Sequence, residues 1–223
     1  MRLFVDPPMT GAENMARDLA LLAEGLPTVR LYGWKPACVS LGYAQPETDI
    51  DADACKMFGL DVVRRPTGGG AILHEEDEVT YSVVLPRTMG PPDLFGSYRF
   101  IANGVIETLS ELGLASTFVE GHTGRDPLCY LREEGVSVAF EGRKISGGAQ
   151  KRTKLAILQH GTILLSRRTE LLARIFQVPS EKVESNIACL RDVDPELTRD
   201  DVLEAAVKGF HRAMAPLAHV AKS

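Results

Sequence analysis

The chain has 223 residues, of which 44% are apolar and 25% charged, and its formal net charge is −5 at pH 7. These values are ordinary for one soluble globular domain and exclude collagen-like, disordered and coiled-coil proteins. No apolar run approaches the ~20 residues of a membrane span, Asp6 and two prolines interrupt any signal-peptide core, and the acidic balance argues against nucleic acid as the main partner, so we expect a cytoplasmic protein.

The first half of the chain predicts two helices and a series of short strands. Apolar spacing indicates an amphipathic helix from Asn14 to a stop near Gly25. The β-rich runs 28–33 and 37–42 flank a Trp-Lys-Pro turn and predict a hairpin. A short helix over 51–58 is closed by Gly59, and strands follow at 61–66, 71–74 and 79–85.

The second half predicts more strands between longer helices. The longest helix covers 95–112 and stops at Gly113, a loop follows at 120–128, and Thr198 is a plausible N-cap for a C-terminal helix. The remaining elements are strands at 136–140, 144–150 and 155–165 and helices at 170–176 and 200–215. Strands and helices do not alternate strictly, so we expect an α/β (α+β) fold over a single domain, 1–223, with a mixed sheet flanked by helices.

The segment Arg64-Arg-Pro-Thr-Gly-Gly-Gly-Ala-Ile-Leu-His74 places three consecutive glycines between two predicted strands. They remove side chains along ~10 Å of backbone and let a ligand lie against the main chain. The segment is not a nucleotide P-loop, because no Lys-Ser/Thr follows. A bulged connection would explain the glycines equally well, but Arg64 and Arg65 favour a site for a carbonyl or phosphate group.

Basic residues concentrate between residues 142 and 169, where seven occur without an acidic residue. This stretch could steer an acidic partner, or it could be a solvated strand edge whose charges oppose aggregation. Within it, Gly142-Arg-Lys-Ile-Ser-Gly-Gly-Ala-Gln150 sets Lys144 among small residues. Lys144 is either an ordinary edge lysine or a cation that polarises a carbonyl or favours a nearby thiolate.

Two further features are compatible with either a structural or a catalytic role. Gln159 and His160 interrupt an apolar strand, and such a pair is more often a satisfied core pair than a catalytic one. Four cysteines without a CxxC pair indicate free thiols and no metal site. A free cysteine is commonly a small buried hydrophobe, and we expect this of Cys38 and Cys55.

In this order and at these separations, the phrases RRPTGGGAILH, GRKISGGAQ and LQHGTILL resemble the motifs of the lipoate–protein ligase and octanoyltransferase superfamily. The likeness includes Asn14-Met-Ala-Arg-Asp and Arg30-Leu-Tyr-Gly-Trp34 and covers roughly residues 5–165. It implies the catalytic-domain fold of biotin and lipoate protein ligases.

The chain most resembles the cysteine-dependent octanoyltransferases, which share RRPTGG, TYSV and LQHG and carry their nucleophile a short way upstream of a lysine. This likeness implies Cys129 as the nucleophile and Lys144 as the catalytic lysine. The family's Pro-Ser and aromatic-Glu element is replaced here by Tyr130-Leu-Arg-Glu-Glu-Gly-Val. The three phrases imply substrate-binding roles for Arg64, Arg65, Thr67, Gly68, Gly69, Gly70, His74, Gly147, Gly148, Ala149, Gln150, His160 and Gly161.

The implied reaction moves octanoyl from acyl carrier protein to Cys129, and then to a lysine of a lipoyl-domain or glycine-cleavage H-type protein, without ATP or another cofactor. Gly68, Gly69 and Gly70 would form a side-chain-free wall for the acyl chain. Two alternatives stay open. One is an ATP-dependent lipoate–protein ligase subunit that needs a separate accessory domain, because only 58 residues follow the last motif. The other is a non-catalytic acyl-binding module.

Overall fold

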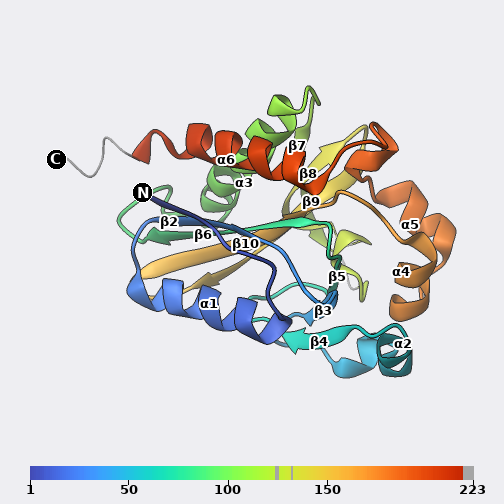
Figure 1. The fold of residues 1–223 in the computed structure, drawn as a ribbon. Helices are drawn as coiled ribbons and strands as arrows, with labels where there is room; N and C mark the ends of the chain where they lie inside the picture. The colour runs from blue at the N-terminus through green and yellow to red at the C-terminus, as the bar shows by residue number, and fades with distance from the viewer. Residues whose placement is uncertain (124–125, 132, 218–223) are drawn as a thin grey trace.

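Two sheets organise the computed structural model, which describes residues 1–123, 126–131 and 133–217. The larger sheet has the order β1-β2-β6-β10-β9-β8-β7, with β1 and β2 parallel and the other neighbours antiparallel. Its strands are β1 (Arg2–Val5), β2 (Thr28–Tyr32), β6 (Val79–Pro86), β10 (Ala156–Ile163), β9 (Arg143–Arg152), β8 (Glu133–Phe140) and β7 (Thr117–Thr123). Helices cover both faces (Figure 1), so the predicted mixed sheet flanked by helices is confirmed.

The smaller sheet shows that the predicted hairpin over residues 28–42 is wrong. It has the order β4-β3-β5, with β4 (Asp61–Arg64), β3 (Cys38–Leu41) and β5 (Ile72–His74). Strand β2 pairs with β1 and β6 in the larger sheet, whereas β3 pairs with β4 and β5. The turn residues at 34–36 mark where the chain bends, but the partners of each strand come from distant segments.

Helix α1 (Gly11–Glu24) covers one face of the larger sheet and confirms the first predicted helix. Thr10 and Glu13 form a capping box at its start, and Gly25 ends it at a φ of 65°. Leu21 and Leu22 pack against residues of β6 and β10. The helix is therefore fixed at both ends and along its apolar side.

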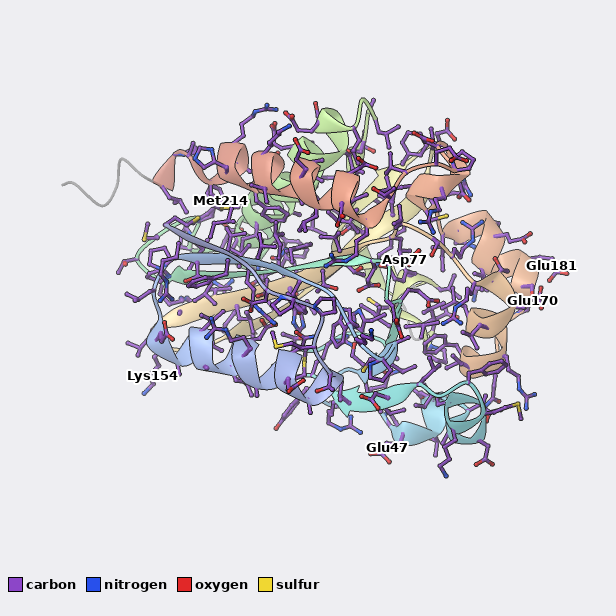
Figure 2. The ribbon with its side chains drawn as sticks, viewed as in Figure 1. Glu47, Asp77, Lys154, Glu170, Glu181 and Met214 are labelled. Carbon is purple, nitrogen blue, oxygen red and sulfur yellow. The ribbon has the colours of Figure 1, made fainter. Side chains whose placement is uncertain are left out.

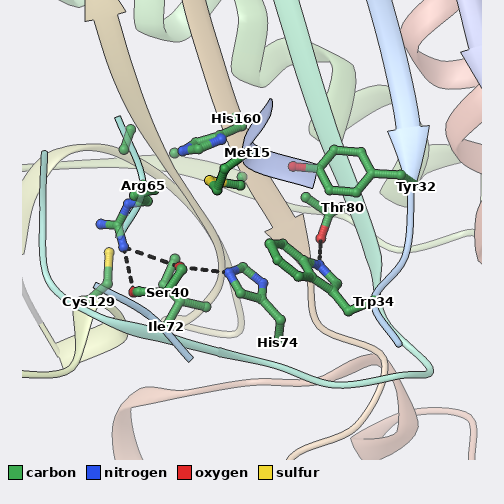
Figure 3. Close-up of a pocket in the computed structure, with 13 residues that line it drawn as sticks. Met15, Tyr32, Trp34, Ser40, Arg65, Ile72, His74, Thr80, Cys129 and His160 are labelled. Atoms are coloured by element: carbon green, nitrogen blue, oxygen red, sulfur yellow. Dashed lines mark hydrogen bonds between the residues drawn. The ribbon is translucent and has the colours of Figure 1, made fainter. Parts of the chain in front are cut away.

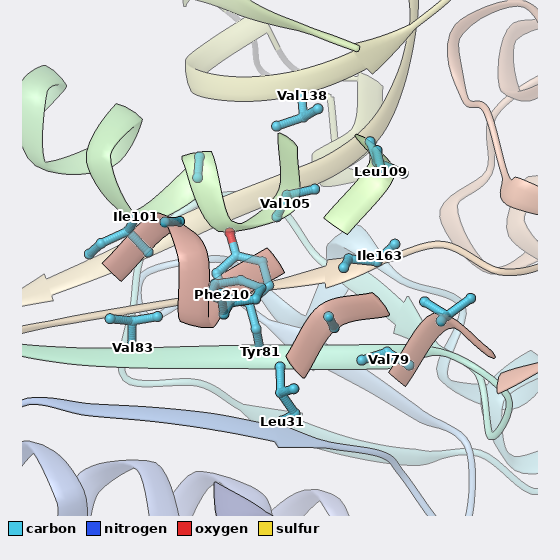
Figure 4. Packing of buried hydrophobic residues seen from close by; sticks show 14 of the residues in the cluster. Leu31, Val79, Tyr81, Val83, Ile101, Val105, Leu109, Val138, Ile163 and Phe210 are labelled. Atoms are coloured by element: carbon cyan, nitrogen blue, oxygen red, sulfur yellow. The ribbon is translucent and has the colours of Figure 1, made fainter. Parts of the chain in front are cut away.

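The predicted helices α3 (Leu94–Glu111) and α6 (Arg199–Met214) cover the opposite face, and Thr198 is the N-cap of α6, as predicted. Figure 4 shows the apolar cluster between these helices and the sheet. A Cβ at Gly104 would lie 2.3 Å from the ring of Phe210, and a Cβ at Gly209 would lie 2.4 Å from the amide of Thr108. Glycine at these two positions lets the helices approach closely.

The remaining elements include several that the sequence pattern did not reveal. Helices α2 (Ala52–Met57) and α4 (Thr169–Phe176) were predicted, whereas β1, β7, helix α5 (Ser180–Asn186) and three short 3₁₀ helices were not: η1 (Glu47–Asp49), η2 (Cys129–Leu131) and η3 (Leu190–Asp192). Part of the predicted loop 120–128 is strand β7, and its residues 124–125 lie outside the described residues.

The outer surface carries charged side chains, including Lys154, Glu170 and Glu181 in Figure 2. In the part of the chain that the structure describes, no helix combines the length and apolarity that crossing a membrane requires.

Candidate active site

A narrow cavity lies between α1 and the two sheets (Figure 3). Its free volume is about 20 Å³, which is room for about one water molecule. Most of its lining comes from the segments that the motifs singled out. The lining residues are Met15, Tyr32, Trp34, Ser40, Arg65, Ile72, His74, Thr80, Cys129, Gly148, Ala149, His160 and Gly161.

Cys129 reaches this cavity because its backbone pairs with the residue that follows the glycine segment. The amide of Ala71 donates to the carbonyl of Pro127, and the amide of Cys129 donates to the carbonyl of Ala71, both at 2.8 Å. Leu128 between them is fully buried. Cys129 itself is partly exposed, whereas the other three cysteines are buried. The expected core positions of Cys38 and Cys55 are confirmed.

Lys144 lies beside Cys129, although it does not belong to the described lining of the cavity. Its Nζ donates to the carbonyl oxygen of Cys129 at 3.1 Å. A Cβ at Gly147 would lie 2.9 Å from Lys144 Cε and 3.9 Å from Cys129 Sγ, so both side chains converge on this glycine. The structure thus brings the predicted nucleophile and the predicted lysine together, with Gly147 leaving the space that they share.

Arg65 is buried, and its guanidinium holds the glycine segment in place. Its Nε donates to Thr67 Oγ1 at 3.1 Å and its Nη1 to the carbonyl of Ser40 at 2.8 Å. Its Nη2 donates to the carbonyls of Gly68 and Gly70 at 2.6 and 2.7 Å. These donors face protein acceptors, so we assign Arg65 to shaping the cavity wall rather than to binding a substrate group directly.

His160 continues this network to a buried carboxylate. Its Nε2 lies 2.7 Å from Thr67 Oγ1 and its Nδ1 lies 3.1 Å from Asp18. Burial lowers the pKa of His160, so its ring is neutral at pH 7. A carboxylate can only accept, so the ring donates from Nδ1 to Asp18 and accepts at Nε2 from Thr67.

Asp18 stays ionised although it is fully buried. Burial by itself raises the pKa of Asp18, but hydrogen bonds from His160 and Ser82 and the charge of Arg30 outweigh it and hold the pKa below its ordinary value. Arg30 donates to Asp18 at 2.9 Å and also to Asp6 at 2.7 Å. The buried ion pair therefore fixes α1 against β2 and orients the imidazole of His160.

His74 lies at the other end of the network. Its Nε2 is 2.8 Å from Ser40 Oγ, its Nδ1 is 2.7 Å from Glu78, and its ring stacks on Trp34 with centroids 3.9 Å apart. The indole of Trp34 donates to Thr80 at 2.7 Å, and Thr80 donates to Glu78 at 2.6 Å. Hydrogen bonds therefore fix the polar walls of the cavity from α1 through β5 to β6.

The glycines that line the cavity are not the three consecutive ones. Gly148 and Gly161 are lining residues, whereas Gly68, Gly69 and Gly70 are absent from the described lining. Gly69 has a φ of 88°, and its carbonyl packs against Gly42, where a Cβ would lie 2.0 Å away. The glycines of the described lining thus belong to β9 and β10, and the acyl-chain wall expected of Gly68, Gly69 and Gly70 stays a prediction.

Four other predicted substrate-binding residues lie outside the described lining: Thr67 and Gly147, whose contacts are given above, and Arg64 and Gln150. Arg64 donates to the carbonyls of Gly42 and Gln45 at 2.9 and 2.6 Å, which fixes the loop after β3. Gln150 donates to Gln159 at 2.8 Å. Both make structural contacts next to the site.

Carboxylates of this chain hold part of the basic stretch. Arg143 and Arg167 both pair with Asp192, at 3.0 and 2.9 Å, and Arg168 pairs with Glu75 at 2.6 Å. These arginines therefore form neither a free strand edge nor a free docking surface. The hypothesis that the basic stretch attracts an acidic partner then rests on the other four of its seven basic residues.

Motif reasoning gave no role to Asp18, Arg30 or Glu78. A signal for the first two was present. Asn14 and Asp18 stand four residues apart on the helix and so share a face, and Arg30 alternates with apolar residues in a buried strand. Polar residues at core positions of two adjacent elements indicate a buried network.

Comparisons with known proteins agree with this geometry. The family model described as "Lipoyl protein ligase A/B catalytic domain" matches residues 10–211. Octanoyltransferase LipM of Geobacillus kaustophilus is 38% identical and that of Bacillus subtilis 34%; each alignment covers 91% of this chain and 82% of the relative. A T. acidophilum protein described as a lipoate protein ligase, solved with bound lipoic acid, has a TM-score of 0.82 at 25% identity and covers 96% of this chain and 86% of its own.

Proposed function

The chain belongs to the lipoyl protein ligase A/B catalytic-domain family, and we propose that it works as an octanoyltransferase through a thioester on Cys129. Curated relatives that align over most of the chain are named octanoyltransferases. The observation that supports the thioester is the position of Lys144 beside Cys129, which itself lines the cavity. The proposed donor is octanoyl-acyl carrier protein, and the proposed acceptor is a lysine of a lipoyl domain or H-type protein.

In the first step the Cys129 thiolate attacks the carbonyl carbon of the donor thioester. A carbon–sulfur bond to Cys129 forms, the bond to the donor sulfur breaks, and the donor leaves as its thiol after taking up a proton. One thioester replaces another, so the step needs no ATP. The ammonium of Lys144, beside Cys129, stabilises the thiolate and the negative charge that develops on the carbonyl oxygen.

In the second step the neutral amine of the acceptor lysine attacks the Cys129 thioester. A carbon–nitrogen bond forms, the amine loses one proton, and Cys129 leaves as the thiolate that the next cycle requires. An amide is more stable than a thioester, so the transfer is downhill. Lys144 again faces the developing oxyanion, which explains why one cation serves both steps.

The acyl chain lies in the cavity beyond Cys129. Gly148 and Gly161 contribute backbone to the described lining, and Ile72 and Met15 offer apolar contacts. Burying the chain stabilises the complex by about 0.8 kcal/mol per methylene.

Mass spectrometry of the intact protein tests this proposal. After incubation with octanoyl-acyl carrier protein we expect one added octanoyl group, located on Cys129 by peptide mapping and removed by hydroxylamine. Cys129→Ser should lose both the adduct and the transfer to an acceptor lipoyl domain. Cys189→Ser is the matched control, since burial raises the pKa of that thiol to about 11 and it lies outside the described cavity lining.

The ligase alternative gives a different result in the same experiment. A protein that consumes ATP with lipoate and still works as Cys129→Ser would be a ligase, and a protein that binds octanoate without transferring it would be a binding module. Lys144→Ala should abolish transfer with the fold intact. Lys144→Arg should rescue poorly, because a planar guanidinium does not fit the space beside Gly147 that a compact ammonium occupies.

A further inference from the structure

The cavity holds far less free space than an eight-carbon acyl chain requires. Its free volume is about 20 Å³, whereas a cavity of about 150 Å³ is the size that admits benzene, a six-carbon ligand. At least one lining side chain must therefore move when the chain enters.

Hydrogen bonds hold most of the lining side chains in place. Trp34 donates to Thr80 and stacks on His74, which lies between Ser40 and Glu78. Tyr32, Arg65 and His160 are bonded in the same way. Moving any of these groups would leave a buried donor or acceptor without its partner, which is unfavourable.

The large apolar side chains of the described lining are Met15 and Ile72. Ile72 is β-branched and lies in strand β5, so its χ1 is restricted. Met15 is unbranched, has three rotatable bonds and packs by van der Waals contact in a small cluster with Tyr32, Trp34 and Cys38. Met15 is therefore the lining side chain that can move at the smallest cost.

The position of Met15 makes its movement relevant to the acyl chain. Figure 3 shows Cys129 on one side of the cavity, Tyr32 and Trp34 on the opposite side, and Met15 over the space between them. A chain attached to Cys129 that extends toward the aromatic side must pass Met15.

The backbone that carries Met15 has little freedom to adjust. Asn14, its neighbour, donates to the carbonyl of Gly33 at 3.0 Å and accepts from Arg30 at 2.7 Å. Asp18, one turn later, is bonded to Arg30 at 2.9 Å. Helix α1 is thus fixed to β2 on both sides of Met15, so only the side chain can adapt.

We propose that Met15 sets the length of acyl chain that the cavity accepts. This inference rests on the proposed function, because it takes the acyl site to be the cavity beside Cys129. The side chain fills the space that the outer carbons of the chain need, and its limited range of movement against Tyr32 and Trp34 stops longer chains.

Replacing Met15 by Ala tests the proposal directly. The change removes three heavy atoms, so chains about two to three carbons longer should fit. We expect the ratio of kcat/KM for decanoyl-acyl carrier protein over octanoyl-acyl carrier protein to rise about tenfold, the value of two buried methylenes. Calorimetric binding of hexanoate, octanoate, decanoate and dodecanoate to the unacylated protein should show the same shift in preferred length.

Two further variants separate chain length from general damage. Met214→Ala removes the same atoms from an equally buried methionine in the α3/α6 cluster on the other face of the sheet, and it should leave the length profile unchanged. Met15→Val removes less volume and is the second variant if Met15→Ala does not fold, with a smaller shift in the same direction.

The two proposals fail in different ways. An unchanged length profile in a folded Met15→Ala or Met15→Val protein, with normal octanoyl transfer, overturns the role of Met15 and leaves the transferase intact. A shifted binding profile in a protein that never acylates Cys129 supports Met15 and contradicts the thioester mechanism.

Discussion

The two faces of the larger sheet use the same alternating strands but hold their helices by different forces. In β2, Val29 and Leu31 point to the α3/α6 face and enter an apolar cluster. Thr28, Arg30 and Tyr32 point to the α1 face, where Arg30 meets a buried carboxylate. Apolar contact is non-directional, whereas a buried ion pair fixes the positions of its atoms. The face that lines the cavity is the one with directional bonds.

The largest effect should come from breaking the buried ion pair. Asp18→Ala removes the fully buried carboxylate that pairs with Arg30, which keeps its bond to the partly exposed Asp6, and it removes an acceptor from Ser82 and His160. We expect a loss of about 4–5 kcal/mol in the free energy of unfolding, measured by urea denaturation.

Asp192→Ala is the control for that change. Asp192 also accepts from two arginines, Arg143 and Arg167, but it lies near the surface. Its removal should cost at most about 1 kcal/mol. Equal losses in the two variants would show that burial does not decide the strength of the Asp18 network.

On the apolar face, Phe210→Ala should cost nearly as much stability and little activity. Phe210 is fully buried, and its ring lies 4.9 Å from that of Tyr81. We expect a loss of about 3–4 kcal/mol, with kcat/KM unchanged at temperatures where the variant stays folded. A fall in kcat/KM larger than the unfolded fraction explains would mean that the two faces are coupled.

The strand pair at the cavity should tolerate no added atom at Gly161. A Cβ there would lie 2.2 Å from the carbonyl oxygen of Gly147 and 2.7 Å from the hydroxyl of Tyr81. We expect Gly161→Ala to cost about 2–3 kcal/mol in thermal unfolding. Gly68→Ala is the matched control, because nothing lies within 4 Å of its Cβ position, and it should stay within about 0.5 kcal/mol.

The smallest predicted effect is a dependence of stability on pH. Burial lowers the pKa of His160 in the folded protein, so from about pH 6.5 downward the unfolded chain binds a proton that the folded chain resists. Stability therefore falls on acidification, by at most about 1.4 kcal/mol per pH unit. His160→Gln should reduce this slope between pH 7 and 5, whereas His211→Gln, exposed on α6, should leave it unchanged.

Local patterns predicted the parts of the fold that local forces decide. The end of α1 at Gly25 and the N-cap of α6 at Thr198 can each be predicted from the residues of a single helical turn. The strand partners of β2 and β3 cannot be predicted in this way, because β2 pairs with β6 and β3 with β4, and burial across the whole fold decides both pairings. Strand β1 was missed for the same reason: its four residues carry a pairing signal only beside β2.

For the site, sequence order predicted which segments meet but not what each side chain does. Cys129 and Lys144 lie together as the motifs implied. Arg65 looked like a ligand-binding residue, yet its donors face carbonyls of the glycine segment. Hydrogen-bond partners depend on three-dimensional proximity, which a linear motif does not specify. Met15 lay in a segment that the likeness included, but the sequence implied no role for it.

The two hydrogen bonds between Ala71 and the segment 127–129 also set the order in which this protein can become reactive. They join segments far apart in the chain. Closing the long loop between Ala71 and Pro127 lowers the chain entropy, and contacts formed late in folding must offset this loss. Cys129 has no cavity beside it until that closure happens. If Cys129 is acylated as proposed, only the folded chain therefore presents the acylation site. The rate at which Cys129 becomes able to take an octanoyl group during refolding would time the final docking of the glycine segment.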